Sequence, residues 1–343
     1  MSERIAIVST SYPAHSNDPS GHFVAAEAEA LARSGHRVLV VAAALDPKDG
    51  FAFERSDHTE KGLPGLEVVR LSAGGAAGWP GLAARLRERP TRWVSLAAWL
   101  LRARRTLIER GPFDRTIAHF LLPAAFPLAA SLDGRALEIV VHGSDARLCA
   151  RLPRLVRRTI RASLLRRGAS FRCSSHEIAR TLEAALELPA GSAAVQAPAL
   201  DLGTVPDRRR ARELLAIAPA QRLAVVVARL VPGKRVAEAL AATALVPDLD
   251  TIVIGDGPEL ASLERRFPAV RFLGRLPRPQ TLTWIAAADV LVSASRDEGA
   301  PSVVREARAL GVPVAARAAG DLEHWAKSDP GLVVVGSAGT EHS

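Results

Sequence analysis

The sequence predicts an α/β protein with two domains, each built on a parallel sheet covered by helices. Apolar strand patterns alternate with helical patterns along the whole chain, as is typical of strands joined by helical crossovers. The chain has 343 residues, more than one hydrophobic core usually serves. An irregular segment between two prolines, residues 198–206, separates two series of strands. We therefore expect domains over residues 1–200 and 204–343.

The first series begins with a βαβ unit. Residues 5–8 and 38–41 are apolar and predict two strands, and residues 23–34 between them predict an amphipathic helix that ends at Gly35. A long loop, from Ser9 to His22, follows the first strand. The rest of the series consists of a helix and two further strands, at residues 92–109, 116–118 and 137–141.

The second series consists of five apolar runs that predict strands, at residues 223–228, 251–254, 270–273, 290–292 and 332–335. After the fourth run, residues 296–300 predict an exit loop. Pro301 then begins a helix that ends at Gly311, before another strand at residues 312–315.

Two carboxylates lie in this last segment, eight residues apart. Glu298 falls in the exit loop and Glu306 in the helix that follows. Ligands of open α/β sheets bind in a crevice at the carboxyl ends of the strands. We therefore expect both carboxylates to border one ligand crevice.

Composition limits the partners. The net charge is +9, almost entirely from arginine, and favours phosphate-bearing partners, namely nucleotides, nucleic acid or an anionic membrane. Only 4% of the residues are aromatic and no nucleic-acid-binding motif occurs, so no nucleic-acid partner is expected. Cys149 and Cys173 have no metal-ligand neighbours at the usual spacing. With no membrane span or signal peptide in the sequence, we expect a cytoplasmic protein with reduced thiols.

Three more strand-exit loops carry candidate residues. Arg229 and Lys234 flank a Pro-Gly turn, so the guanidinium fork and the ammonium can reach one diphosphate. Gly255 begins a tight turn that permits close backbone approach. His142 follows a buried strand, where it can contact a ligand or make a structural hydrogen bond. No G-x-G-x-x-G or P-loop motif occurs, which argues against ordinary dinucleotide and P-loop sites.

Taken together, these loops resemble those of the retaining GT-B glycosyltransferases, in particular glycosyltransferase family 4 (glycosyl transferases group 1). The resemblance spans most of the chain, and its segments follow the order of the family. They are residues 9–13 with 21–23, 32–38, 142–145, 228–234, 255–258, 272–274 and 298–306.

The resemblance implies two Rossmann-like domains facing across a cleft. It also implies transfer of a sugar, with retention, from a nucleotide-diphosphate sugar (UDP- or GDP-sugar) to a saccharide or lipid-linked acceptor, in the synthesis of cell-envelope polysaccharide or glycoconjugates. In the family, Glu298 would lie beside the donor sugar and Glu306 would hold the ribose. His142 would approach the sugar from the first domain.

The remaining donor contacts are also implied by the resemblance. Arg229 and Lys234 match the cations that bind the diphosphate, and the amides at the start of the helix after Glu298 would face the phosphates. The leaving phosphate would take the acceptor's proton, so no side-chain nucleophile, cofactor or metal is expected. The other assigned donor-binding residues are Gly21, Gly255, Gly299, Ala300, Pro301 and Ser302.

Two departures from the family stand out. Relatives usually continue past the strand at residues 332–335 with helices that cross back to the first domain. This chain ends at Ser343, so the resemblance predicts either a shortened C-terminus without those helices or an incomplete sequence. Ala300 stands where a larger residue is common, which would reshape the sugar pocket.

Two basic helices leave alternatives open. Residues 151–167 carry seven arginines and no acid, with an apolar stripe, and arginines also flank Trp93 and Trp99. Such helices are either core helices with a solvated charged face or docking elements for anionic lipid, which would place the protein on the inner face of the membrane.

Two other function classes stay open beside the transferase. One is an epimerase or hydrolase of sugar nucleotides, which would need additional acid and base groups. The other is a catalytically silent protein that only binds sugar nucleotides, an alternative favoured by the short C-terminus.

Overall fold

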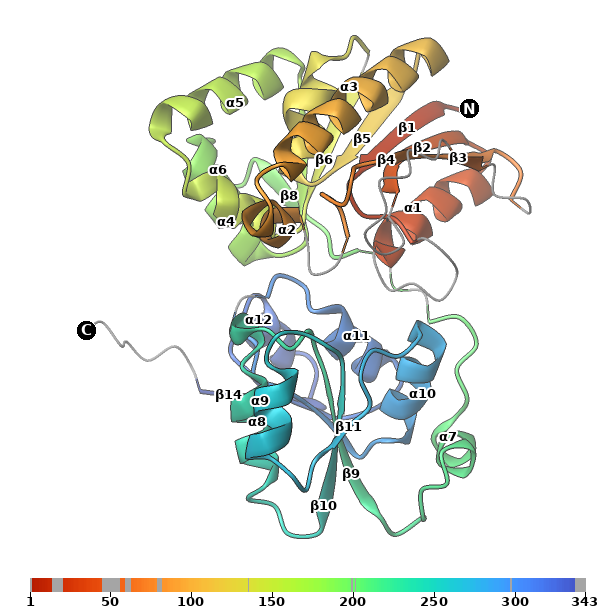
Figure 1. Cartoon of the computed structure of the whole chain (residues 1–343), viewed down its shortest axis with the longest axis vertical. Coiled ribbons are helices and arrows are strands. Elements are labelled where there is room, and N and C mark those ends of the chain that lie inside the picture. Colours follow the sequence, from red (N-terminus) through yellow and green to blue (C-terminus); the bar gives the residue numbers. More distant parts are fainter. Residues whose placement is uncertain are drawn as a thin grey trace. The chain divides into compact units, whose positions relative to one another are not determined.

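The chain folds into two compact units, Met1–Ala199 and Leu200–Ser343 (Figure 1). The computed structural model describes residues 2–13, 21–44, 56–58, 63–78, 82–134, 136–198, 200, 202–296 and 298–336, with residues 56–58 described by their backbone alone. Four predicted features therefore lie partly outside the described residues: residues 14–20 of the first long loop, residues 199 and 201 of the linker, residue 297 of the exit loop that carries Glu298, and residues 337–343 at the C-terminus.

The first unit is built on a sheet in which the strand order reverses beside its first strand. The order is β3-β4-β2-β1-β5-β6-β7-β8, and all pairs are parallel except β3 with β4. The strands are β1 (Arg4–Ser9), β2 (Arg37–Ala44), β3 (Ser56–His58), β4 (Leu66–Ser72), β5 (Arg115–His119), β6 (Ala136–Val141), β7 (Ser170–Cys173) and β8 (Ala193–Val195).

Helices cover both faces of this sheet. On one face, α1 (His22–Arg33) packs Val24, Ala28 and Ala32 against Ile5 and Ile7 of β1. The opposite face packs against a larger core that includes Trp99. The other helical elements are α2 (Leu82–Glu88), α3 (Arg92–Arg110), η1 (Leu121–Leu128), η2 (Ala129–Ser131), α4 (Ser144–Ala150), α5 (Arg154–Arg166) and α6 (His176–Leu186).

The second unit has a fully parallel sheet with the order β11-β10-β9-β12-β13-β14. This is the Rossmann strand order, and its reversal point lies between β9 and β12. The strands are β9 (Arg222–Val227), β10 (Leu249–Ile254), β11 (Arg271–Phe272), β12 (Val290–Ser293), β13 (Val314–Arg317) and β14 (Leu332–Val335).

Helices also cover both faces of the second sheet. One core lies under α8 and α9 and contains Val226, Leu240 and Leu263, and the other lies under α7, α10 and α11. The helical elements are α7 (Arg208–Leu214), η3 (Pro232–Lys234), α8 (Val236–Thr243), α9 (Leu260–Arg266), α10 (Arg278–Ala287), α11 (Ser302–Ala309) and α12 (Leu322–Ala326). The prediction of two Rossmann-like α/β domains is confirmed.

Three local predictions are corrected. Pro301 immediately precedes α11 instead of occupying its first helical position, with an extended ψ of 112°. The strand expected at residues 312–315 begins two residues later, at Val314. The apolar stripe expected on the basic helix is only partly buried: Ile160 and Leu164 enter the core, whereas Leu155 is 77% exposed. One turn of inward-facing residues is therefore enough to hold α5.

The turn after β10 depends on close backbone packing. Gly255 has a φ of 145°, and a Cβ added there would lie 1.8 Å from the carbonyl oxygen of Ala228. The adjoining chain is held by backbone hydrogen bonds from Ala228 N–H to the Ile254 oxygen (3.1 Å) and from Gly255 N–H to the Gly274 oxygen (2.8 Å). Glycine is thus required at residue 255 by space as well as by φ.

Gly255→Ala is therefore expected to lower the free energy of unfolding by about 2 to 5 kcal/mol, from backbone strain and steric overlap together. Gly274→Ala is the matched control, because Gly274 has a φ of 66° but nothing within 4 Å of an added Cβ. Its cost should be only about 1 to 2 kcal/mol. Urea unfolding of both variants measures the difference, and equal losses would contradict the packing argument.

Candidate functional site

In the second unit, the loops after β9 and β12 meet at the reversal point of the sheet. The backbone N–H of Arg296 donates to the carbonyl oxygen of Gly233 at 3.0 Å. Beside this bond, Nζ of Lys234 donates to Oε1 of Glu298, a residue 64 positions away in the sequence. The structure thus brings two of the predicted site residues into direct contact.

The Lys234–Glu298 pair is largely withdrawn from solvent. The two side chains are only 18% and 17% exposed. Partial burial strengthens the attraction between the charges, but it also raises the cost of leaving either one without a partner. The pair offers one cation for an anionic group and one carboxylate that can accept hydrogen bonds from hydroxyls.

Other cations of this loop differ in their surroundings. Arg229 is exposed, directly after β9. Arg235 follows Lys234 with a φ of 46°, a left-handed conformation that is unusual for a residue with a side chain. The guanidinium of Arg235 forms an ion pair with Glu238 at 3.2 Å. Arg235 therefore has a local partner on α8.

Glu306 is held by an arginine that the sequence did not suggest as a site residue. Val304 and Ala307 bury the inner face of α11, and Glu306 between them is only 6% exposed. The Arg278 guanidinium, at the start of α10, donates to Oε1 of Glu306 at 2.8 Å. Arg278 lies between Pro277 and Pro279, and this pattern gave no indication of its contact with Glu306.

Glycines at the predicted site have packing roles. A Cβ on Gly21 would lie 2.3 Å from the carbonyl oxygen of Ser11, and a Cβ on Gly320 would lie 2.4 Å from that of Gly299. These close approaches hold the strand-exit loops in place. The donor contacts assigned to Gly21, Gly255 and the segment from Gly299 through Ala300 and Pro301 to Ser302 stay predictions.

In the first unit, a buried carboxylate fixes the backbone around His142. Asp145 accepts hydrogen bonds from the N–H groups of Leu121 (2.7 Å), His142 (3.1 Å) and Gly143 (2.9 Å). Burial raises the pKa of Asp145, and these backbone donors oppose that shift. Asp145 is thus a structural residue of the turn before α4.

The His142 ring lies against a second histidine. Nε2 of His142 is 3.1 Å from Nδ1 of His119, and the ring planes are inclined by only 12°. Phe23 and Phe120 flank the His142 ring at centroid distances of 4.4 and 4.8 Å. His119 is the last residue of β5 and is 1% exposed. Its position at the end of a buried strand, like that of His142, was the signal that could have identified it.

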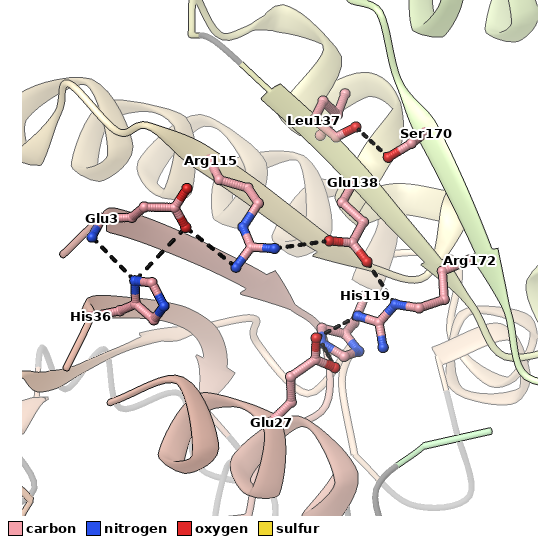
Figure 2. A network of polar contacts seen from close by, with 9 residues as sticks. All are labelled: Glu3, Glu27, His36, Arg115, His119, Leu137, Glu138, Ser170 and Arg172. Atoms are coloured by element: carbon pink, nitrogen blue, oxygen red, sulfur yellow. Dashed lines mark hydrogen bonds and ion pairs between the residues drawn. The ribbon is translucent and has the colours of Figure 1, made fainter. Parts of the chain in front are cut away.

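A chain of charged side chains continues from His119 across the sheet (Figure 2). Glu27 Oε2 lies 3.5 Å from Nε2 of His119, and Oε1 of the same carboxylate accepts a hydrogen bond from Arg172. Arg172 also donates through Nε to Glu138 at 2.6 Å. From Glu138 the chain of ion pairs runs through Arg115 to Glu3 and His36.

The two cysteines, possible metal ligands and a hollow near Arg4 do not extend the site. Burial raises the pKa of Cys149 to about 11 and that of Cys173 to about 12, so both buried thiols stay protonated at neutral pH. Within the described ranges, no cluster of three or more His, Cys, Asp or Glu side chains could hold a metal ion. A hollow of about 430 Å³, lined in part by Arg4, Arg37 and Phe113, lies at the starts of β1 and β2, the opposite sheet edge from His142.

The sequence of the second unit has a recognisable family pattern. Residues 207–338 match the family described as glycosyl transferases group 1. The matched region extends from α7 past β14, and includes Arg229, Lys234, Glu298 and Glu306.

Relatives extend the similarity beyond the group 1 domain. The chain is 30% identical over 220 residues to the putative teichuronic acid biosynthesis glycosyltransferase TuaC of Bacillus subtilis. That match covers 61% of this chain and 54% of TuaC, so the chain matches about half the length of this curated relative.

Solved structures share the fold of both units. Sucrose-phosphate synthase from Thermosynechococcus elongatus has a TM-score of 0.69 at 19% identity, covering 94% of this chain and 83% of that one. Anabaena Alr3699/HepE in complex with UDP-glucose has a TM-score of 0.59 at 19% identity, covering 94% and 82%. At these identities the likeness shows the shared fold of two parallel-sheet α/β domains.

Lys234→Ala tests the predicted anion site of the group 1 domain. The variant is expected to weaken binding of a nucleoside diphosphate by about 1.5 to 3 kcal/mol, the usual range for a charge-assisted hydrogen bond. It also leaves the Glu298 carboxylate without its partner, next to the incoming anion. Isothermal titration calorimetry measures the change, with Lys327→Ala, a substitution of an exposed lysine, as the control. Unchanged affinity in Lys234→Ala would remove this residue from the site.

Proposed function

We propose that the protein is a retaining glycosyltransferase of family 4. It transfers a sugar from a UDP- or GDP-sugar to a saccharide or lipid-linked acceptor in cell-envelope polysaccharide or glycoconjugate synthesis. The observation that carries the proposal is the Lys234–Glu298 pair at the reversal point of a sheet in the group 1 domain. The names of TuaC and the UDP-glucose complex of HepE support it by describing the activity and ligand of those two proteins.

In this proposal, donor binding replaces the Lys234–Glu298 contact. The diphosphate binds the ammonium of Lys234, because phosphate oxygens accept charge-assisted hydrogen bonds well. Arg229 and the backbone N–H groups at the start of α11 are further donors to the diphosphate. Glu298 is then released to accept hydrogen bonds from hydroxyls of the donor sugar. Glu306, held in place by Arg278, binds the ribose.

The proposed reaction needs no side-chain nucleophile. The bond between the anomeric carbon and the phosphate oxygen breaks, and the acceptor hydroxyl oxygen bonds to that carbon from the same face. The acceptor's proton goes to the leaving phosphate. Lys234 and Arg229 stabilise the negative charge that grows on the phosphate, where electrostatic stabilisation lowers the barrier most. His142 contacts the sugar, and neither a cofactor nor a metal takes part.

A panel of radiolabelled sugar nucleotides, incubated with the protein with and without a membrane extract, tests the proposal. Transfer of label to extract material supports the transferase. A changed sugar nucleotide, or release of free sugar without an acceptor, would indicate an epimerase or hydrolase instead of a transferase. Binding of a sugar nucleotide without turnover would indicate a catalytically silent binding protein.

With an active donor identified, the two glutamates should separate kinetically. Glu298→Gln is expected to lower kcat mainly, because Glu298 orients the reacting sugar, whereas Glu306→Gln should mainly raise the donor KM. Each change should be about tenfold or more, the effect of one charged hydrogen bond. Steady-state kinetics of both variants measures this, and the opposite pattern would exchange their roles.

We further propose that the protein works in the cytoplasm, on the inner face of the membrane, and that α5 contacts anionic lipid. No helix among the described residues is both long and apolar enough to span a bilayer.

On α5, Leu155 is 77% and Leu165 45% exposed, so apolar side chains face solvent within a row of arginines. Among the described residues, one carboxylate, that of Glu187, forms the ion pairs of Arg154, Arg158 and Arg161, so this surface is strongly positive. Exposed leucines among unbalanced arginines fit an anionic bilayer surface.

Leu155→Ser is expected to reduce binding to vesicles that contain anionic phospholipid by about tenfold, because it removes one inserting apolar side chain. Vesicle co-sedimentation measures this, and binding should fall with added salt. Leu245→Ser is the matched control, since Leu245 is 84% exposed in the second unit. Equal binding by both variants, or binding to neutral vesicles as strong as to anionic ones, would support the solvated-face alternative for α5.

A further inference from the structure

The His119–His142 pair shares a single proton position. Nδ1 of His119 and Nε2 of His142 are 3.1 Å apart, so one of these nitrogens carries the hydrogen and the other accepts it. No described residue forms a hydrogen bond to the other nitrogen of His142, Nδ1, and the His142 side chain is partly exposed. The state of Nδ1 is therefore set by the direction of the bond between the two rings.

Both rings are neutral at neutral pH. Burial lowers the pKa of His119 to about 3, with a further contribution from the positive charge of Arg172. Burial also lowers the pKa of His142 well below its usual value, with His119 and Arg172 adding to the shift. A neutral imidazole has one N–H and one acceptor nitrogen. Only two arrangements of the pair are therefore available, which differ in the direction of the shared hydrogen bond.

Glu27 distinguishes these two arrangements. Its Oε2 faces Nε2 of His119 at 3.5 Å, while Arg172 donates to its Oε1. The contact is electrostatic and not a hydrogen bond, and the negative charge of the carboxylate favours the His119 tautomer with hydrogen on Nε2. The Nδ1 of His119 then has no hydrogen and must accept from Nε2 of His142. This leaves Nδ1 of His142 with a free lone pair.

We infer that Glu27 and His119 are positioning residues that fix His142 in the tautomer whose free Nδ1 accepts a hydrogen bond from a ligand hydroxyl. The inference rests on the proposed function, in which that hydroxyl belongs to a sugar. It assigns His142 the role of an acceptor that orients a hydroxyl. The opposite tautomer would present an N–H to the same group and repel a hydroxyl hydrogen directed at it.

Replacing Glu27 with glutamine should reverse the arrangement. A guanidinium has only donors, so Arg172 keeps the amide oxygen of the glutamine on its own side. The amide NH₂ then takes the place of Oε2 and donates to Nε2 of His119. His119 must in turn carry its hydrogen on Nδ1 and donate to His142, whose remaining hydrogen moves to Nδ1.

Glu138→Gln is the matched control. Glu138 also accepts a hydrogen bond from Arg172, at 2.6 Å, and it is part of the same ion-pair network, where it also pairs with Arg115. Among the described residues, Glu138 contacts Arg115 and Arg172 but neither histidine ring. The control thus removes one carboxylate from Arg172 but leaves the group that faces His119.

The experiment is ¹⁵N NMR of the histidine-labelled full chain at pH 7, in which imidazole ¹⁵N shifts distinguish protonated from unprotonated nitrogens. Signals are assigned by their loss in His142→Asn and His119→Asn. We expect hydrogen on Nε2 and a free Nδ1 at His142 in the wild type and in Glu138→Gln, and the reverse in Glu27→Gln. Hydrogen on Nδ1 of His142 in the wild type overturns the inference even if no variant folds. An unchanged His142 in Glu27→Gln, or reversal in both variants, overturns the role of Glu27.

Transfer kinetics provides a separate test. With an active donor, Glu27→Gln should lower kcat about tenfold, the effect of one lost hydrogen bond, and change the donor KM less. Glu138→Gln should leave both near their wild-type values. If the NMR result holds but no donor supports transfer, the proposed function fails and the tautomer assignment stands. Full kcat in a Glu27→Gln variant with reversed tautomers overturns the acceptor role of His142.

Discussion

Both groups of candidate residues depend on one constraint, the reversal of strand order beside the first strand of each parallel sheet. At such a point the loops from two neighbouring strands turn in opposite directions, and this leaves space for side chains between them. In the second unit the loops after β9 and β12 bring Lys234 and Glu298 together as an ion pair. In the first unit, α1 follows β1 and supplies Glu27 and Phe23, while β5 ends at His119. The sheets determine where chemistry can occur, and the loops determine which chemistry it is.

The sequence was sufficient for the strands of the second unit and for the loops that carry Lys234 and Glu298, because buried parallel strands are short apolar runs and their exit loops must share one edge. It did not predict β3, β4, β7 or β8 of the first unit. It was not sufficient for Arg278 or for Glu27. An arginine at a helix start and a glutamate on an amphipathic helix look like solvated charges until the packing of their helices is known. The exposure of Leu155 was not predicted either, for a different reason. Helical periodicity predicts an apolar stripe but does not say how much of it the core covers.

Residues that matched the family pattern do not all have the same physical role. Gly21 and Gly255 have positive φ angles, and neighbouring carbonyl oxygens occupy the space of an added side chain. Asp145 satisfies backbone N–H groups and shapes the turn before α4. These residues hold the loops in position through backbone packing and hydrogen bonds. A different role is open to the charged side chains of Lys234, Glu298 and Glu306. Each of them forms an ion pair that a ligand could replace or share, whereas Gly21, Gly255 and Asp145 support the backbone.

Helix α1 has a mechanical relation to His142. Phe23 packs against the imidazole at 4.4 Å, and Glu27, one helical turn later, faces His119 on its far side. The same carboxylate is tied through Arg172 to β7 and, through Glu138, to β6. Helix α1 therefore links the packing of the His142 imidazole, through Phe23, to the charge that faces its partner ring, through Glu27.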